Sequence, residues 1–253
     1  MDIFNIIILI LAGGVAGFIN TIAGSGSLIT LPLLMFMGLD ANVANGTNRI
    51  AILLQNVVGV KSFHNQKLID KKNSLKLLLP SVVGSIVGAN LAIELNETIM
   101  KQTIAGLLII MFFIILFKPE KWVKSQAGEV KAKSTFFQWI VFFAIGVYGG
   151  FIQAGVGFFL LSGLVLSVGY DLIRANAMKL LIVLAYTPIA LLIFIFHEQI
   201  NYTLGFILAI GNMIGAYIAA KFASKIGAKY IRYILLAIIL VSAFKLLNIY
   251  SYL

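Results

Sequence analysis

Long apolar runs, separated by short polar connections, dominate the chain. No stretch shows the regular alternation of a membrane-barrel strand. Several runs have the length of a helix that crosses about 30 Å of hydrocarbon: Ile3 to Ile22, Leu75 to Leu95, Ile99 to Phe117, Ile173 to Phe196, Thr203 to Ala220 and Ile231 to Leu247. The pattern predicts an all-α polytopic membrane protein. Because the first run starts beside Asp2 and not beside basic residues, we expect a retained helix and not a cleaved signal peptide.

Residues 17 to 48 and 150 to 179 are two versions of one segment, and glycine interrupts the apolar sequence in both. From Gly26 onward, adding 131 to the residue number superposes them: Gly26 falls on Gly157, Gly38 on Gly169, Asp40 on Asp171, Ala44 on Ala175, Asn45 on Asn176, Leu53 on Leu184 and Gly84 on Gly215. The chain is therefore an internal duplication. Paired interrupted helices in a membrane protein indicate the substrate site of a transporter.

We expect a first membrane repeat at residues 1–117, a basic cytoplasmic linker at 118–135 and a second membrane repeat at 136–253. Each repeat would hold a glycine-interrupted helical hairpin, Ile3 to Met37 or Phe136 to Val168, followed by three transmembrane helices. A hairpin adds an even number of crossings, whether it is re-entrant or fully spanning. The odd total per repeat predicts two inverted-topology repeats.

Composition and charge agree with this topology. Hydrophobic residues make up 61% of the chain and charged residues 11%, which is too apolar for a soluble domain. The net charge is +10, but 14 of the 19 Lys and Arg lie in three connections: Lys61 to Lys76, Lys118 to Lys133 and Lys221 to Arg232. Cytoplasmic loops retain basic residues, so these segments indicate orientation and not nucleic-acid binding. The connections near Asn96 and His197 would then lie outside.

The second arms of the hairpins, Ser27 to Met37 and Phe158 to Val168, hold about eleven residues each. At 1.5 Å per residue, such an arm covers roughly half a bilayer. The two glycine tips, Gly24-Ser25-Gly26 and Gly155-Val156-Gly157, are therefore expected to meet near the midplane. Each tip precedes a helix start with unpaired N–H groups, which suits an anion. Alternatively, the small residues serve only close helix packing.

Polar residues near the tips are Asn20, Thr21, Ser25 and Ser27 in the first copy and Gln153 in the second. Each hairpin is followed by the pattern Asp-x3-Ala-Asn and then by a cation, Arg49 or Lys179. Buried cations at this depth are functional hypotheses, although they could also reach the interface or pair with the nearby aspartate.

Other polar groups have less specific predictions. Asp40 and Asp171 are expected to cap helices. Six further polar residues could line a path or form hydrogen bonds between helices: Gln55, Asn56, Tyr148, Tyr186, Thr187 and Asn212.

Several chemistries are not supported. The chain has no phosphate-binding G-x-x-x-x-G-K-[ST] loop, so it is not expected to hydrolyse ATP. It has no cysteine, and its two histidines, His64 and His197, lie far apart in the topology, so neither a metal site nor a catalytic triad is expected. We expect no enzyme activity and no cofactor.

The stretch G-F-I-N-T-I-A-G-S-G-S-L-I-T-L-P-L-L (Gly17 to Leu34), followed by A-N-G-T-N (Ala44 to Asn48), resembles the sulfite exporter TauE/SafE family of membrane permeases. The second half carries a weaker copy, with Gly163 where the first half has Pro32. The resemblance covers essentially the whole chain. It implies transport of small sulfur-containing anions across the bacterial inner membrane, commonly outward. The motif positions are Gly17, Asn20, Gly24, Gly26, Pro32, Ala44, Asn45, Thr47 and Asn48.

These observations predict a secondary transporter, and by resemblance an exporter, for sulfite or an organosulfonate that works by alternating access. Its expected partners are this small anion and the lipid bilayer, and no nucleic acid. Whether the protein forms a homodimer stays open. Uptake, a channel for another small anion and a non-transporting assembly subunit stay open. The predicted substrate-binding residues are Asn20, Thr21, Gly24, Ser25, Gly26, Asn45, Thr47, Asn48, Arg49, Gln153, Gly155, Gly157, Asn176 and Lys179.

Overall fold

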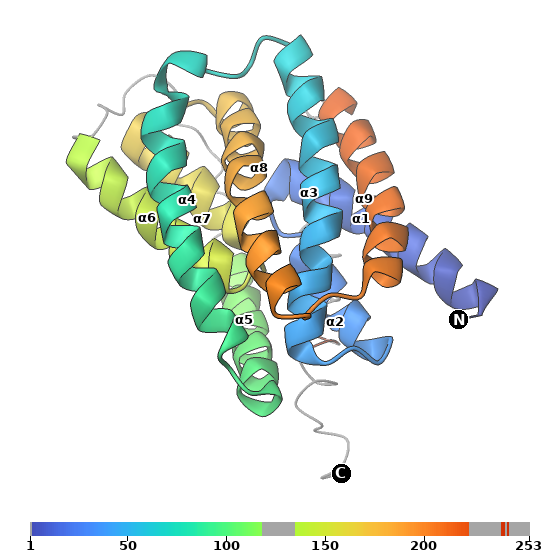
Figure 1. Cartoon of the computed structure of the whole chain (residues 1–253). Helices are drawn as coiled ribbons and strands as arrows, with labels where there is room; N and C mark the ends of the chain where they lie inside the picture. The colour runs from blue at the N-terminus through green and yellow to red at the C-terminus, as the bar shows by residue number, and fades with distance from the viewer. Residues whose placement is uncertain (1, 118–134, 223–238, 241, 243–253) are drawn as a thin grey trace.

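A computed structural model describes residues 2–117, 135–222, 239, 240 and 242, and this part of the chain is helical without strands (Figure 1). The first half holds α1 (Ile3–Ala23), α2 (Ser27–Phe36), α3 (Ala41–Asn65), α4 (Lys71–Ile93) and α5 (Glu97–Phe117). The second half holds α6 (Thr135–Phe151), α7 (Val156–Gly163), the π-helical turn η1 (Leu164–Val168), α8 (Leu172–Phe196) and α9 (Tyr202–Phe222). The predicted linker, except Thr135, and most of the run Ile231 to Leu247 lie outside the described residues.

The helices have membrane-spanning dimensions. Among the described residues, α1, α4, α5, α8 and α9 are long and apolar enough to cross a bilayer. Helix α3 is also 25 residues long, but it carries many buried polar side chains. Helices α2 and α7 have 10 and 8 residues, so each is shorter than a full span, as predicted. The all-α polytopic fold is confirmed.

Polar and apolar side chains are distributed as expected for a protein in lipid. Large apolar side chains are exposed along the outer helices, for example Leu11 on α1, Leu79 on α4 and Phe206 on α9. Several polar side chains inside the bundle, including Arg49 and Gln55 on α3, are fully buried. Since lipid can satisfy no polar group, the polar residues must find partners inside the bundle.

The two halves exchange helices. Helices α3 and α8 lie side by side at the centre, α1 packs on α9, and α6 packs on α4 (Figure 1). Glycines permit both outer pairings: a Cβ at Gly17 would lie 2.2 Å from the Asn212 carbonyl oxygen, and one at Gly150 would lie 2.1 Å from that of Ser85. At these two positions glycine therefore serves close helix packing.

The duplication extends to backbone conformation. Among the described residues, six have a positive φ, and they form three pairs that are each 131 residues apart: Gly24 and Gly155, Gly38 and Gly169, Lys67 and Glu198. Their φ angles agree closely within the pairs, at 75° and 73°, 93° and 85°, and 59° and 57°. The same breaks in the helices thus recur at the sequence-derived spacing.

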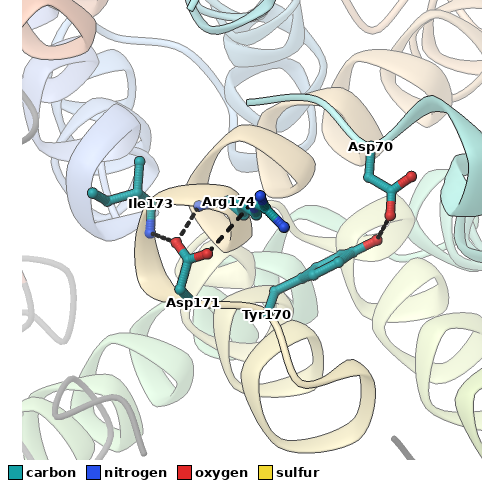
Figure 2. A network of polar contacts seen from close by, with 5 residues as sticks. All are labelled: Asp70, Tyr170, Asp171, Ile173 and Arg174. Carbon is teal, nitrogen blue, oxygen red and sulfur yellow. Dashed lines mark hydrogen bonds and ion pairs between the residues drawn. The ribbon is translucent and has the colours of Figure 1, made fainter. Parts of the chain in front are cut away.

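Hydrogen bonds show which connections between helices lie together on each of two faces of the bundle. On one face, Asp70 before α4 accepts from the hydroxyl of Tyr170 before α8, at 2.7 Å (Figure 2). On the other, Asn42 after α2 donates to Leu95 O before α5, at 2.7 Å. Because α4 runs from the first face to the second, the two short hairpin arms end on opposite faces.

The basic connections fit this arrangement. The side chain of Gln66, in the segment Lys61 to Lys76, donates to Ala220 O at 3.2 Å, and Ala220 lies beside the basic segment that starts at Lys221. The described start of this second segment therefore lies on the same face as the first, in agreement with the predicted cytoplasmic orientation. The third basic segment, Lys118 to Lys133, lies outside the described residues.

One of the two predicted helix caps is confirmed. The Asp171 carboxylate accepts from Ile173 N and Arg174 N, both at 3.0 Å, and caps α8 (Figure 2). The prediction for Asp40 is wrong, because its side chain forms no cap hydrogen bond. The carboxylate of Glu97, on the first turn of α5, accepts instead from Ala41 N at 2.8 and 2.7 Å, so another helix supplies the cap.

Candidate functional site

The two glycine tips meet, as the sequence predicts. Gly24 and Gly155 both adopt the left-handed conformation, which turns the chain sharply at each tip. Gly157 N donates a hydrogen bond to Gly24 O at 3.0 Å. A Cβ on Gly24 would lie 2.3 Å from the Cα of Gly157, so the contact requires glycine on both sides. The helix starts of α2 and α7 are thereby brought to one place.

Arg49, on α3 of the first half, binds the end of α6 in the second half. Its Nη1 donates to Gly149 O at 3.2 Å, and its Nη2 donates to Gly150 O at 2.5 Å and to Phe151 O at 3.4 Å. The carbonyls at a helix end lack partners within the helix and carry partial negative charge. The guanidinium also lies over the Phe194 ring, with Cζ 4.5 Å from the ring centroid.

Lys179, on α8 of the second half, makes the reciprocal contact with α1 of the first. Its Nζ donates to Asn20 O at 2.9 Å and to Thr21 O at 3.0 Å, close to the end of α1. The third bond runs to Asn176 Oδ1 at 2.9 Å. An ammonium has three donors, so every donor of Lys179 is in use.

Both cations are buried without a neutralising carboxylate. Their side chains are 0% (Arg49) and 1% (Lys179) exposed, which excludes their reaching the interface in this conformation. In the described part of the chain, neither has an ion-pair partner, so pairing with the nearby aspartate is also excluded. Burying an unpaired charge costs several kcal/mol, and helix-end carbonyls offset only part of that cost. The tip region therefore has an excess of positive charge.

Polar side chains surround each tip at positions related by the repeat. In the first half, the amide groups of Asn20 and Asn212 both donate to Gln55 Oε1, at 3.1 and 3.5 Å. In the second half, Gln153 Nε2 donates to Thr187 Oγ1 at 3.3 Å, and Tyr186 lies at the position that matches Gln55. A Cβ on Gly149 would lie 2.7 Å from the Tyr186 hydroxyl, so this hydroxyl lies beside Gly149, the residue whose carbonyl accepts from Arg49.

Ser25, Gly26 and Thr21, which the sequence predicts to bind substrate, lie at or beside the first tip. Ser25 is fully buried, and its hydroxyl has no hydrogen-bond partner. Gly26 packs against α1, where an added Cβ would lie 2.2 Å from Ala16 O. The Thr21 hydroxyl bonds back to Gly17 O at 2.9 Å, so only its carbonyl faces Lys179.

The predicted residues on α3 divide between two environments. Asn45 Nδ2 donates to Phe151 O at 2.8 Å, beside Arg49. Asn48 instead joins α3 to α2 through Thr30 at 2.6 Å and Ser27 at 3.1 Å. Thr47 accepts from Asn201 N at 2.8 Å and holds the α8–α9 connection. Thr47 thus has a partner away from the tip contact, whereas Asn48 binds Ser27 beside the first tip. Substrate binding by both residues stays a prediction.

Gln55, Tyr186, Thr187 and Asn212 surround the tips but were predicted only as general path-lining groups. The repeat itself carries the signal that could have singled them out. Adding 131 places Gln55 on Tyr186 and Asn56 on Thr187, so polar residues occupy matched positions in both halves. The same spacing places Lys179 on Asn48, and Arg49 on Leu180, so the two cations are not equivalent.

The model of a protein family described as "Sulfite exporter TauE/SafE" matches residues 9–246. The chain belongs to this family. Similar proteins include the "Probable membrane transporter protein ORF9" of Sinorhizobium sp., which is 27% identical over 94% of this chain and 91% of its own length. "Probable membrane transporter protein YfcA" of Escherichia coli K12 is 26% identical over 92% of this chain and 86% of its own length. A "Probable membrane transporter protein" of Haemophilus influenzae is 26% identical over 89% of this chain and 88% of its own length.

Family membership and the apolar spanning helices identify this TauE/SafE protein as a multi-pass bacterial membrane protein. The names of the relatives support membrane transport as its general role. Such a role implies a lipid bilayer and a small substrate.

Proposed function

We propose that this TauE/SafE protein is a secondary transporter that exports a small sulfur-containing anion, such as sulfite or an organosulfonate. The observation that carries the proposal is the pair of buried cations, Arg49 and Lys179, placed beside two helix starts without a carboxylate partner among the described residues. The positive ends of α2 and α7 add to the same field. A small anion that enters this region compensates the excess charge.

The substrate class has a separate basis. The family description names a sulfite exporter, which favours a sulfur oxyanion over a halide. Oxyanions accept several hydrogen bonds at once, and the tips offer the amide and hydroxyl groups of Asn20, Ser25 and Gln153 for this purpose. Arg49 or Lys179 would offset the charge.

The transport cycle that we propose is alternating access between two inverted repeats. The short arms α2 and α7 start at the shared tip contact and end on opposite faces, so the hairpins open in opposite directions. Helix exchange between the halves means that a rocking motion of one half moves walls on both sides of the tips. The anion would reach the tips from one face at a time.

Competition in proteoliposomes tests the substrate class. Vesicles containing the full chain are preloaded with unlabelled sulfite, and entry of labelled sulfite is measured against external thiosulfate, sulfate, sulfoacetate or chloride. We expect a sulfur anion to compete at much lower concentration than chloride. Equal competition by chloride, or none by any sulfur anion, would overturn the proposed substrate class.

A further inference from the structure

We infer that the anion is bound on one side of the tip contact, by the Arg49 Nε–H group and the Tyr186 hydroxyl, and that Lys179 is a structural residue that does not touch it. This inference rests on the proposed transport of a small oxyanion and specifies where that anion is held. It makes Tyr186 a substrate-contacting residue.

The first observation is that one donor of the Arg49 guanidinium, the Nε–H group, has no partner. Both terminal nitrogens are committed to carbonyls at the end of α6, and the Phe194 ring covers one face of the guanidinium. The Nε atom is buried and has no hydrogen-bond partner. Since Nε–H lies in the guanidinium plane, the stacked ring does not satisfy it. The helix end thus fixes the orientation of the cation and leaves one charged donor available.

The hydroxyl of Tyr186 is the second observation. It is fully buried and unpartnered, and it lies beside Gly149, whose carbonyl accepts from Arg49. The side chain of Gln153 is also close, but the two form no hydrogen bond of normal geometry, and Gln153 Oε1 is itself unpartnered. A small shift would pair Tyr186 with Gln153 in the empty protein. An oxyanion, as the stronger acceptor, would take the hydroxyl instead.

The first half has unpartnered donors of its own, Ser25 Oγ and Gln55 Nε2, but the cation bound there has none. Lys179 has no donor left after binding Asn20 O, Thr21 O and Asn176 Oδ1. At the position that matches Tyr186, Gln55 already accepts from Asn20 and Asn212 through Oε1. Among the described residues, a cation that keeps an unused donor therefore occurs on the Arg49 side, next to the unused Tyr186 hydroxyl. An off-centre anion follows from this difference between the halves.

The test measures anion binding to the purified full chain. The shift in melting temperature is recorded with increasing sulfite, sulfate and chloride for wild type, Tyr186→Phe, Tyr186→Gln, Tyr148→Phe and Lys179→Met. Tyr148 is a matched control because its hydroxyl is close to the second tip but is committed to Ala154 O. We expect Tyr186→Phe to weaken oxyanion binding about tenfold, the effect of one charge-assisted hydrogen bond, and Tyr148→Phe to leave it unchanged.

Tyr186→Gln keeps a donor and is expected to bind more tightly than Tyr186→Phe. Lys179→Met, once folded, removes a charge that does not touch the anion, so it is expected to weaken chloride and oxyanion binding alike, whereas Tyr186→Phe weakens oxyanion binding selectively. Oxyanion binding that is equal in wild type and Tyr186→Phe would overturn the inference while sulfite counterflow by wild type upholds the proposed function. Conversely, a Tyr186-dependent response to sulfate without sulfite transport would uphold the binding site and overturn the proposed substrate. A wild type that binds none of the anions would overturn both.

Discussion

The amide of Gly157 donates a 3.0 Å hydrogen bond to the carbonyl oxygen of Gly24, and this bond joins two hairpin tips that are far apart in the sequence. Each glycine also occupies space that no side chain could share, because a Cβ on Gly157 would lie 2.1 Å from the Cα of Gly24. The two halves are thus in direct backbone contact at the place where the proposed anion site lies.

This contact predicts that Gly157→Ala and Gly24→Ala abolish transport. Alanine must push the tips apart, and at Gly24 it must also adopt a left-handed backbone that costs roughly 1–2 kcal/mol. Counterflow and size-exclusion profiles of the purified variants measure the effect. Gly106→Ala is the control, since an added Cβ there meets nothing within 4 Å, and alanine stabilises a helix by about 1 kcal/mol relative to glycine. Normal transport by Gly157→Ala would contradict the tip contact.

The reciprocal binding of helix ends predicts that each cation acts on the opposite half. Lys179→Met leaves the Thr21 carbonyl at the end of α1 without its partner, at about 1–3 kcal/mol, whereas Asn20 O keeps its bond from Gly24 N. We expect faster amide hydrogen exchange at residues 20–26, with little change at residues 149–157. Arg49→Met should produce the reverse. An increase confined to the mutated helix in both variants would show that the cations do not hold the hairpins.

The helix caps provide a prediction on stability. Asp171→Ala should lower the free energy of unfolding by about 1 kcal/mol, because it removes the acceptor for two amides at the start of α8. Asp40→Ala should have little effect, since Glu97 provides the cap of α3. Glu97→Ala should therefore resemble Asp171→Ala. Thermal unfolding in one detergent compares the three variants, and a larger loss for Asp40→Ala than for Glu97→Ala would contradict the observed cap.

Inversion of the repeats predicts opposite labelling of matched positions. The chain has no cysteine, so Lys67→Cys and Glu198→Cys introduce single thiols at two exposed residues that are 131 apart and share one backbone conformation. An impermeant thiol reagent applied to intact cells should label the cysteine at position 198 and leave the one at position 67 unlabelled. Lysed cells provide the control for reactivity. Labelling of both positions from the same side would show that the repeats are parallel.

The sequence predicted the helical class, the duplication and the meeting of the tips because glycine spacing and hydropathy depend on local sequence. The partners of Arg49 were not predictable in this way. They are carbonyls about 100 residues away, and α6 packs against α4 in the folded protein, which leaves its end within reach of Arg49. Nor does a motif indicate which way a side chain points: Asn45 reaches the end of α6, whereas Asn48, one turn later, binds α2.

Asp40 shows that a helix cap cannot be predicted from the local sequence alone. Its position before α3 suits a cap, yet the carboxylate of Glu97 on α5, 56 residues after Ala41, occupies that role. Polar residues deep in a membrane bundle take whichever partner the packing brings near, because lipid offers none. The spacing of the repeat could have predicted more of the site, because it relates Gln55 to Tyr186 before any contact is known.

Counterflow of labelled sulfite tests the proposed carrier most directly. Proteoliposomes that hold the full chain and unlabelled sulfite are diluted into a trace of labelled sulfite, beside vesicles with Arg49→Met and with the Gly106→Ala control. We predict transient accumulation of label above its external concentration for wild type and Gly106→Ala, and none for Arg49→Met. Label that only equilibrates would indicate a channel, and no entry with folded wild-type protein would contradict sulfite transport.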